Sequence, residues 1–160
     1  MKKVVIMRGV PGSGKGHYVK QLVSDAGRRQ VAVCSADHFF ERKGRAIEVG
    51  GPPMVYDFDP ARLPEAHAAC MTAFVQALRQ GCETVVVDNT NVRQWMYEAY
   101  VEAARLAGYD VEIVEVMPVT LGELRVCAER NVHGVPPEAV YRMAWEFEPD
   151  SRAVQVRPGF

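Results

Sequence analysis

Apolar and polar residues along this chain follow two alternating patterns. Four short runs of mostly apolar, often β-branched residues predict buried β-strands, over 2–8, 30–35, 83–87 and 109–117. Between and after these runs, apolar residues recur at helical spacing, which predicts helices over 15–23, 60–80, 92–107, 120–130 and 137–147. Continuous apolar strands that alternate with helices are typical of a parallel sheet covered on both faces, so we expect a three-layer α/β fold.

Turn and capping residues indicate where several of these elements begin. The Asp-Pro pair at 59–60 suits the N-cap and first position of a helix. Thr120 with Glu123 forms a capping box. The Gly- and Pro-rich stretch 44–60 has no periodicity and is predicted to be a long surface loop. The tail from Pro149 is short and contains proline, and no element is assigned to it.

Three predicted strands end in residues suited to ligand binding. Gly9 follows the strand at 2–8, Asp37 follows the next strand, and Asp88 follows the third. Parallel strands present their carboxyl ends at one edge of the sheet, where the ligands of such folds bind. We therefore expect these three residues to meet at one site.

A glycine-rich loop, residues 9–16 (GVPGSGKG), joins the first predicted strand to the first predicted helix. Its glycines allow the backbone to curl so that successive N–H groups point at a phosphate, and its lysine adds positive charge at the helix N-terminus. This spacing and context match a phosphate-binding loop; the alternative is a tight turn with an incidental lysine. The residues expected to hold the nucleotide are Gly12, Ser13, Gly14, Lys15, Gly16 and His17.

Gly16 stands where most phosphate-binding loops have Ser or Thr, whose hydroxyl holds magnesium. We expect Mg²⁺ to bind the phosphate oxygens instead, with Asp37 and Asp88 holding its waters. Asp37 could also accept the proton of an attacking hydroxyl as a general base. The structural alternatives are that Asp37 caps a helix and that Asp88 caps a helix or closes a turn.

Two arginines of the predicted helix 120–130, Arg125 and Arg130, are candidates for a charge that folds over the nucleotide phosphates. Such an arginine would stabilise the negative charge of the transition state. The alternative is that both are solvated, or form weak ion pairs, as most surface arginines do.

Residues near Asp37 indicate where an acceptor would enter. Arg42 belongs to the one local basic cluster, RKGR at 42–45. Tyr56, like the two phenylalanines at 39–40, flanks the irregular stretch and could stack on bases. The alternatives are a solvated charged loop and packing of these aromatic rings into the core.

The overall composition is that of an ordinary globular chain, with 160 residues and a formal net charge of −1. It predicts one domain and excludes a global basic field, so a nucleic-acid partner has to be held by a local patch. No apolar run reaches the ~18 residues that a membrane span needs. Four scattered cysteines without metal-ligand spacing suggest reduced thiols in a cytoplasmic protein.

Five ordered segments together resemble the kinase domains of the polynucleotide kinase superfamily. They are GVPGSGKG, SADHFF, YDFDPARLPEAH, VVVDNTN and ERNVHGVP. Within the superfamily, the chain resembles the P-loop kinase-like domain of NEDD4-binding protein 2 and phage kinases that modify DNA. The resemblance implies a single P-loop kinase domain over 1–160, with a sheet of about five strands and a helical lid at about 120–137.

By that resemblance, the glycine loop holds ATP, Asp37 is the general base, and Arg130 is the lid arginine that reaches the transferred phosphate. The residues that would line the acceptor or metal side are Asp88, Asn89, Thr90 and Asn91. The implied acceptor is a hydroxyl on nucleic acid, DNA rather than RNA: a 5′-OH end or the hydroxymethyl group of a modified pyrimidine. Two alternatives stay open, a kinase of nucleosides, nucleotides or other small molecules and a nucleotide-binding module without transfer activity. No obligate protein partner is implied.

Overall fold

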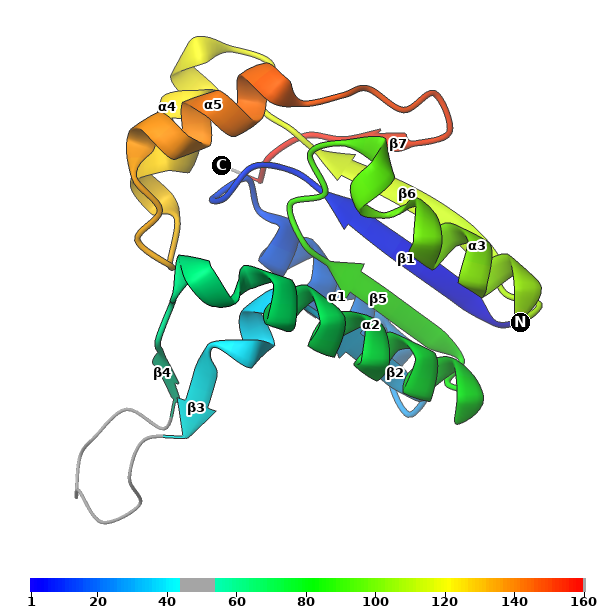
Figure 1. Ribbon diagram of the computed structural model, residues 1–160. Coiled ribbons are helices and arrows are strands. Elements are labelled where there is room, and N and C mark those ends of the chain that lie inside the picture. Colours follow the sequence, from blue (N-terminus) through cyan, green and yellow to red (C-terminus); the bar gives the residue numbers. More distant parts are fainter. Residues whose placement is uncertain (44–53, 160) are drawn as a thin grey trace.

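A parallel sheet of five strands forms the centre of the computed structural model, which describes residues 1–43 and 54–159. The strands lie in the order β2–β5–β1–β6–β7, and every neighbouring pair is parallel. They are β1 (Lys3–Arg8), β2 (Val31–Cys34), β5 (Thr84–Asp88), β6 (Asp110–Val116) and β7 (Val154–Val156). The four strands predicted from the apolar runs are confirmed, and β1, which leads into the glycine loop, is the central one (Figure 1).

Helices cover both faces of the sheet, which gives the predicted three layers (Figure 1). They are α1 (Lys15–Ala26), α2 (Leu63–Arg79), α3 (Glu98–Leu106), α4 (Leu121–Arg130) and α5 (Pro137–Glu146), with 3-10 turns η1 (Ala36–Phe39), η2 (Pro60–Arg62) and η3 (Gln94–Met96). On one face, Phe74 of α2 meets Tyr100 of α3, with ring centroids 5.0 Å apart. On the other face, Val19 of α1 is buried. Adjacent residues of β1 serve opposite faces, Val4 the first and Val5 the second, because side chains alternate along a strand.

Helices α4 and α5 form a separate pair beyond the carboxyl ends of the central strands (Figure 1). Their inner residues Cys127 and Val140 share a small apolar cluster with Val10 of the glycine loop. The predicted capping box is confirmed at the start of α4, where Thr120 Oγ1 accepts a hydrogen bond from the Glu123 backbone N–H at 3.1 Å. In the part of the chain that the structure describes, no helix combines the length and apolar character needed to cross a membrane.

The stretch predicted as a loop over 44–60 contains regular structure near its carboxyl end. Strand β4 (Met54–Tyr56) pairs antiparallel with β3 (Glu41–Lys43) and forms a separate two-stranded sheet. Residues 44–53 between these strands lie outside the described residues. The loop prediction is therefore wrong for β4, because a strand of three residues is too short to show a periodicity.

Two predicted helices begin later than the sequence pattern indicates. Asp59 is an N-cap as predicted and accepts a hydrogen bond from the Ala61 backbone N–H at 3.0 Å, but it caps η2, the 3-10 turn before α2. The helix predicted over 92–107 is wrong in its first turn, since α3 begins only after η3. There the carbonyl of Val92 accepts from the Glu148 backbone N–H at 2.9 Å, which holds this backbone in a long-range contact instead of a helix.

The tail contains a strand that the hydrophobic pattern did not predict. Strand β7 adds to the free edge of β6 in parallel, with Val154 opposite Val114 and Val156 opposite Val116. Three residues at a sheet edge carry too little alternation to be recognised in a sequence. Strand β7 brings the sheet to the number of strands that the family resemblance implied.

Candidate active site

The glycine loop, called the phosphate loop below (residues 9–16), curls between β1 and α1. Gly12 and Gly14 have φ angles of 78° and 103°, in the left-handed region that glycine adopts without strain. The start of the loop is held by a hydrogen bond from the Gly9 backbone N–H to the carbonyl of Thr90, at 3.0 Å. The backbone therefore has the curled form that the sequence predicts for binding phosphate.

Lys15 occupies the centre of this loop. Its Nζ donates to the carbonyls of Gly9 at 2.9 Å and Val10 at 3.1 Å. Burial lowers the pKa of Lys15, while the carboxylates of Asp88 and Asp37 act in the opposite direction. The ammonium thus contacts the loop backbone and lies within the field of both predicted acids.

A buried hydroxyl of the loop indicates how a polyphosphate would fit. The Ser13 side chain is fully buried, and within the described residues its Oγ has no hydrogen-bond partner. Buried hydroxyls nearly always have a partner, so an oxygen-rich ligand would supply what this group lacks. Among the described residues, no cluster of three or more His, Cys, Asp or Glu side chains could hold a metal ion.

Asp37 lies at the end of β2, on the turn η1. Ser35 caps this turn, since its Oγ accepts from the Asp37 backbone N–H at 3.2 Å. The alternative role of Asp37 as the cap residue is therefore excluded. Its carboxylate Oδ2 lies 3.5 Å from Nδ1 of His133, which is on the loop after α4. The sequence patterns had not singled out His133, although it lies within ERNVHGVP; only its position in that segment could have drawn attention to it.

Asp88 ends β5, as predicted, and is only partly exposed. Burial raises the pKa of Asp88, and Lys15 opposes this rise; Asp37 adds to it, and His38 and His133 oppose it. Ionisable side chains from η1, β5, the phosphate loop and the loop after α4 therefore share one site. The predicted meeting of the strand-end acids at this edge of the sheet is what the structure shows.

The residues after Asp88 mainly support the loops around the site. Asn89 Oδ1 accepts from the Ala36 backbone N–H at 2.9 Å and so anchors the turn that carries Asp37. Asn91 is 3% exposed, and its Nδ2 donates to the carbonyl of Met7 at 2.8 Å. The prediction that Asn91 lines the acceptor side is wrong, because its side chain is buried against β1.

The roles predicted for Asn89 and Thr90 toward an acceptor stay predictions. The same holds for His17, which is exposed on the first turn of α1. Arg42 and Tyr56 lie on the paired strands β3 and β4, and their side chains fall outside the described part of the structure. Of the other basic residues of that cluster, Lys43 lies on β3 with its side chain likewise outside the described part, and Arg45 lies outside the described residues altogether.

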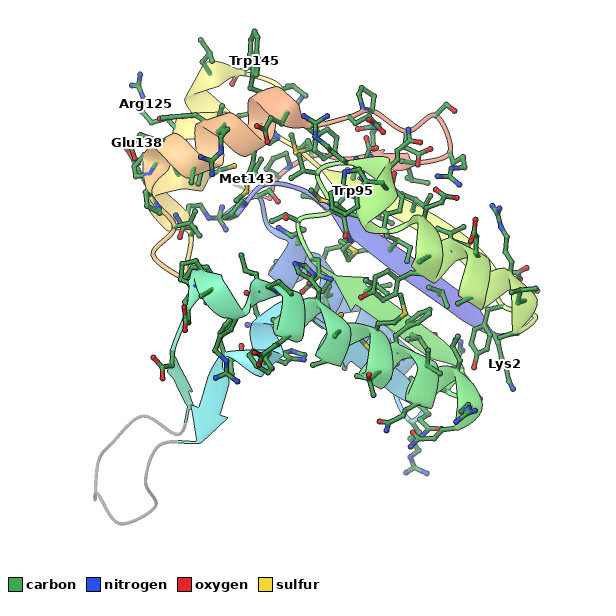
Figure 2. The ribbon with its side chains drawn as sticks, in the orientation of Figure 1. Lys2, Trp95, Arg125, Glu138, Met143 and Trp145 are labelled. Atoms are coloured by element: carbon green, nitrogen blue, oxygen red, sulfur yellow. The ribbon has the colours of Figure 1, made fainter. Side chains whose placement is uncertain are left out.

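Arg125 and Arg130 lie on different sides of α4. A helix turns about 100° per residue, so Arg125 projects about 160° away from Cys127 and Arg130 about 60° away from it. Cys127 faces the phosphate loop, where it shares an apolar cluster with Val10. Figure 2 shows Arg125 at the outer margin of the α4–α5 pair. Arg125 therefore points away from the phosphate loop in this arrangement, and its predicted contact with the nucleotide, like the lid role of Arg130, stays a prediction.

The two phenylalanines next to Asp37 pack against each other, and Phe40 is the buried one. Phe40 is 5% exposed, and its ring lies edge-to-face against Phe39 at 5.3 Å and Phe58 at 5.1 Å between centroids. Arg62 lies over the outer ring, Phe39, at 4.7 Å. Core packing is thus the correct interpretation for Phe40.

Two human proteins contain segments similar to this chain. NEDD4-binding protein 2 of Homo sapiens is 28% identical over 145 residues, which is 91% of this chain and 8% of that protein. YLP motif-containing protein 1 of Homo sapiens is 30% identical over 162 residues, which is 91% of this chain and 7% of that protein. The chain therefore spans less than a tenth of the length of either relative.

Solved structures share the fold at low sequence identity. A chain of the Pnkp1/Rnl/Hen1 RNA repair complex has a TM-score of 0.64 at 15% identity, over 95% of this chain and 49% of that chain. Kti12 of Chaetomium thermophilum, in complex with ADP-AlF3, has a TM-score of 0.62 at 15% identity, over 96% and 88%. APS kinase CysC of Mycobacterium tuberculosis, in complex with AMPPNP and APS, has a TM-score of 0.57 at 19% identity, over 99% and 90%.

The family match covers nearly all of the elements described above. The family model AAA_33, described as an AAA domain, matches residues 4–148, from β1 to the end of α5. This span contains the phosphate loop, both strand-end acids and the α4–α5 pair. The chain therefore belongs to the AAA_33 family of AAA domains and has the P-loop kinase fold.

Proposed function

We propose that this chain is an ATP-dependent phosphotransferase that acts on a hydroxyl group of nucleic acid. The acceptor would be the 5′-OH end of a polynucleotide or the hydroxymethyl group of a modified pyrimidine in DNA. The observation that carries the proposal is the meeting of Lys15 with two carboxylates, Asp37 and Asp88, at the phosphate loop. A cation for the phosphates and a carboxylate that can take a proton are groups that phosphoryl transfer uses.

The phosphate loop supports binding of the ATP phosphates. Lys15 Nζ would exchange the carbonyls that it now contacts for phosphate oxygens, and the buried Ser13 hydroxyl would gain a partner. The N-terminus of α1 adds the positive end of its dipole. Because Gly16 supplies no hydroxyl, Mg²⁺ would be held by phosphate oxygens and waters, with Asp88 behind a water. When bound, the ion neutralises charge on the phosphates.

Asp37 is placed to act on the acceptor. Its side chain is 45% exposed, so a hydroxyl can approach it from solvent. As the acceptor oxygen forms a bond to the γ-phosphorus, the bond from that phosphorus to the bridging oxygen of ADP breaks, and the hydroxyl proton passes to Asp37. Arg130, at the end of α4, would neutralise charge on the transferred group.

Nucleic acid is the preferred acceptor because of two observations. The fold is shared with a chain of an RNA repair complex, and the basic stretch that contains Arg42 follows the turn that carries Asp37. A small-molecule acceptor is the second candidate, favoured by the net charge of −1 and by the fold shared with an APS kinase solved with APS. A nucleotide-binding module without transfer activity is the third, and its support is the missing hydroxyl at Gly16.

The test is an acceptor panel with γ-labelled ATP. We expect label on 5′-OH oligonucleotides or on DNA that contains hydroxymethyluracil, and none on free nucleosides or APS. In Asp37→Asn, transfer should fall at least about a hundredfold while ATP affinity is retained, since only the proton acceptor is lost. Label confined to small molecules would show that the acceptor is a small molecule and not nucleic acid. ATP binding without any transfer would favour the non-catalytic module.

A further inference from the structure

The contact between Asp37 and His133 joins two segments that are remote in the sequence. Asp37 follows β2, and His133 lies on the loop between α4 and α5. Their nearest side-chain atoms, Oδ2 and Nδ1, are 3.5 Å apart. Catalytic contacts are commonly somewhat long before a substrate is bound, so this separation suits a pair that acts together in the complex with substrate.

The loop that carries His133 is built to hold one conformation. Asn131 Nδ2 donates to the carbonyls of Ala128 at 2.8 Å and Val135 at 3.1 Å, and Asn131 Oδ1 accepts from the Val135 backbone N–H at 2.7 Å. Gly134 takes a φ of 66°, which closes the turn. The Asn131 side chain thus forms hydrogen bonds to the backbone on both sides of the loop, at Ala128 and Val135, and His133 lies between these residues.

The backbone of Asp37 is fixed independently. Ser35 Oγ accepts from its N–H, and Asn89 Oδ1 accepts from the N–H of Ala36. These bonds set the position of the Asp37 Cα, whereas the direction of its carboxylate depends on contacts of the side chain itself. A partner for one carboxylate oxygen is what orients the group, because it sets the direction in which the other oxygen is presented.

We infer that His133 is a positioning residue for Asp37: its imidazole holds Oδ2 so that Oδ1 is presented to the acceptor hydroxyl. This inference rests on the proposed function, in which Asp37 is the general base. It also implies that the segment from Cys127 to His133 orients the base. This segment lies over the phosphate loop, since the carbonyl of Cys127 lies against Gly12.

Two substitutions at His133 separate positioning from simple packing. The amide nitrogen of Asn takes the place of Nδ1, whereas that of Gln takes the place of Nε2. We expect His133→Gln to lower kcat about tenfold to a hundredfold and His133→Asn to keep most of the wild-type kcat. The KM for ATP and the Tm should match wild type in both, because only the direction of the carboxylate changes.

The control is Val132→Ala in the same loop. Val132 is 89% exposed, so its truncation should change neither kcat nor Tm. Equal losses of kcat in His133→Asn and His133→Gln, or a wild-type kcat in His133→Gln, would overturn the inference. If wild type is active and Asp37→Asn is not, such a result refutes the positioning role alone. Failure of wild type to phosphorylate any acceptor would instead refute the proposed function, and this inference with it.

Discussion

The carbonyl oxygen of Cys127 lies against Gly12, only 2.0 Å from the point that a Cβ on this glycine would occupy. The phosphate loop and helix α4 are therefore in backbone contact, with no room for any side chain between them. This contact ties the segment that carries Arg130 and His133 to the loop that would hold the nucleotide.

Substitution of Gly12 by alanine should damage the site more than substitution of any exposed loop glycine. The new Cβ would meet backbone, which no side-chain rotation can relieve, and would sit at a φ of 78°. We expect a loss of about 2–4 kcal/mol in the free energy of unfolding, together with loss of ATP binding. Gly16→Ala is the matched control for stability, since a Cβ there meets nothing within 4 Å. Equal unfolding midpoints for the two variants in urea would contradict the contact.

A second prediction concerns the buried ion pair between Arg8 and Glu115, whose side chains are 0% and 2% exposed. Arg8→Met leaves the Glu115 charge buried without its partner, and the expected destabilisation is about 3–5 kcal/mol. The double variant Arg8→Met, Glu115→Leu should recover part of that loss, because the uncompensated charge is removed as well. Chemical denaturation followed by circular dichroism measures both. A double variant less stable than Arg8→Met would show that the remaining charge is not the cause.

Asp150 should make the protein sensitive to acid. The Arg152 side chain donates to its carboxylate and lowers the pKa of Asp150 below the ordinary 3.8, and the hydroxyl of Tyr97 donates to it as well. A carboxyl with a lowered pKa in the folded state stabilises the protein above its ordinary pKa, and this stabilisation is lost as the pH falls below that value. Unfolding free energies measured from neutral pH down to about pH 3 should therefore fall more steeply in wild type than in Asp150→Asn. Parallel curves for the two proteins would exclude Asp150 as the source of the acid sensitivity.

Arg130 and Arg125 provide a matched pair on one helix. Arg130 lies on the side of α4 nearer the phosphate loop, so Arg130→Ala should lower kcat about a hundredfold or more, since one charge on the transferred phosphate is lost. Arg125 lies at the outer margin (Figure 2), and Arg125→Ala should leave kcat unchanged. The measurement is the steady-state kcat of both variants with the acceptor identified in the panel. A larger loss of kcat in Arg125→Ala than in Arg130→Ala would support the nucleotide contact that the sequence predicts for Arg125.

A substitution of Gly16, the residue after Lys15, should improve the use of Mg²⁺. A Cβ at Gly16 would meet nothing within 4 Å, so Gly16→Thr places its first side-chain atom in open space. Its hydroxyl would supply the magnesium ligand that most phosphate-binding loops have, and we expect transfer to saturate at a lower Mg²⁺ concentration than in wild type. Gly16→Ala separates this effect from the gain in helix propensity. An identical Mg²⁺ dependence in all three proteins would mean that position 16 does not reach the ion.

The sequence by itself determined the layered fold, the phosphate loop and the acids at the strand ends. These features are written in contiguous residues: apolar runs, helical spacing, and a glycine motif between a strand and a helix. Topology then brings Asp37 and Asp88 to one edge, because parallel strands end on the same side of a sheet.

Only the tertiary structure decided which polar residues serve the site and which support the fold. Asn91 is buried against β1, Arg125 faces away from the phosphate loop, and His133 lies beside Asp37. Arg8, at the end of an apolar run, turned out to be wholly buried and paired with Glu115 from β6. Each of these outcomes depends on a side chain that meets a distant segment. Periodicity and spacing report only on neighbours along the chain, so they cannot specify such a meeting.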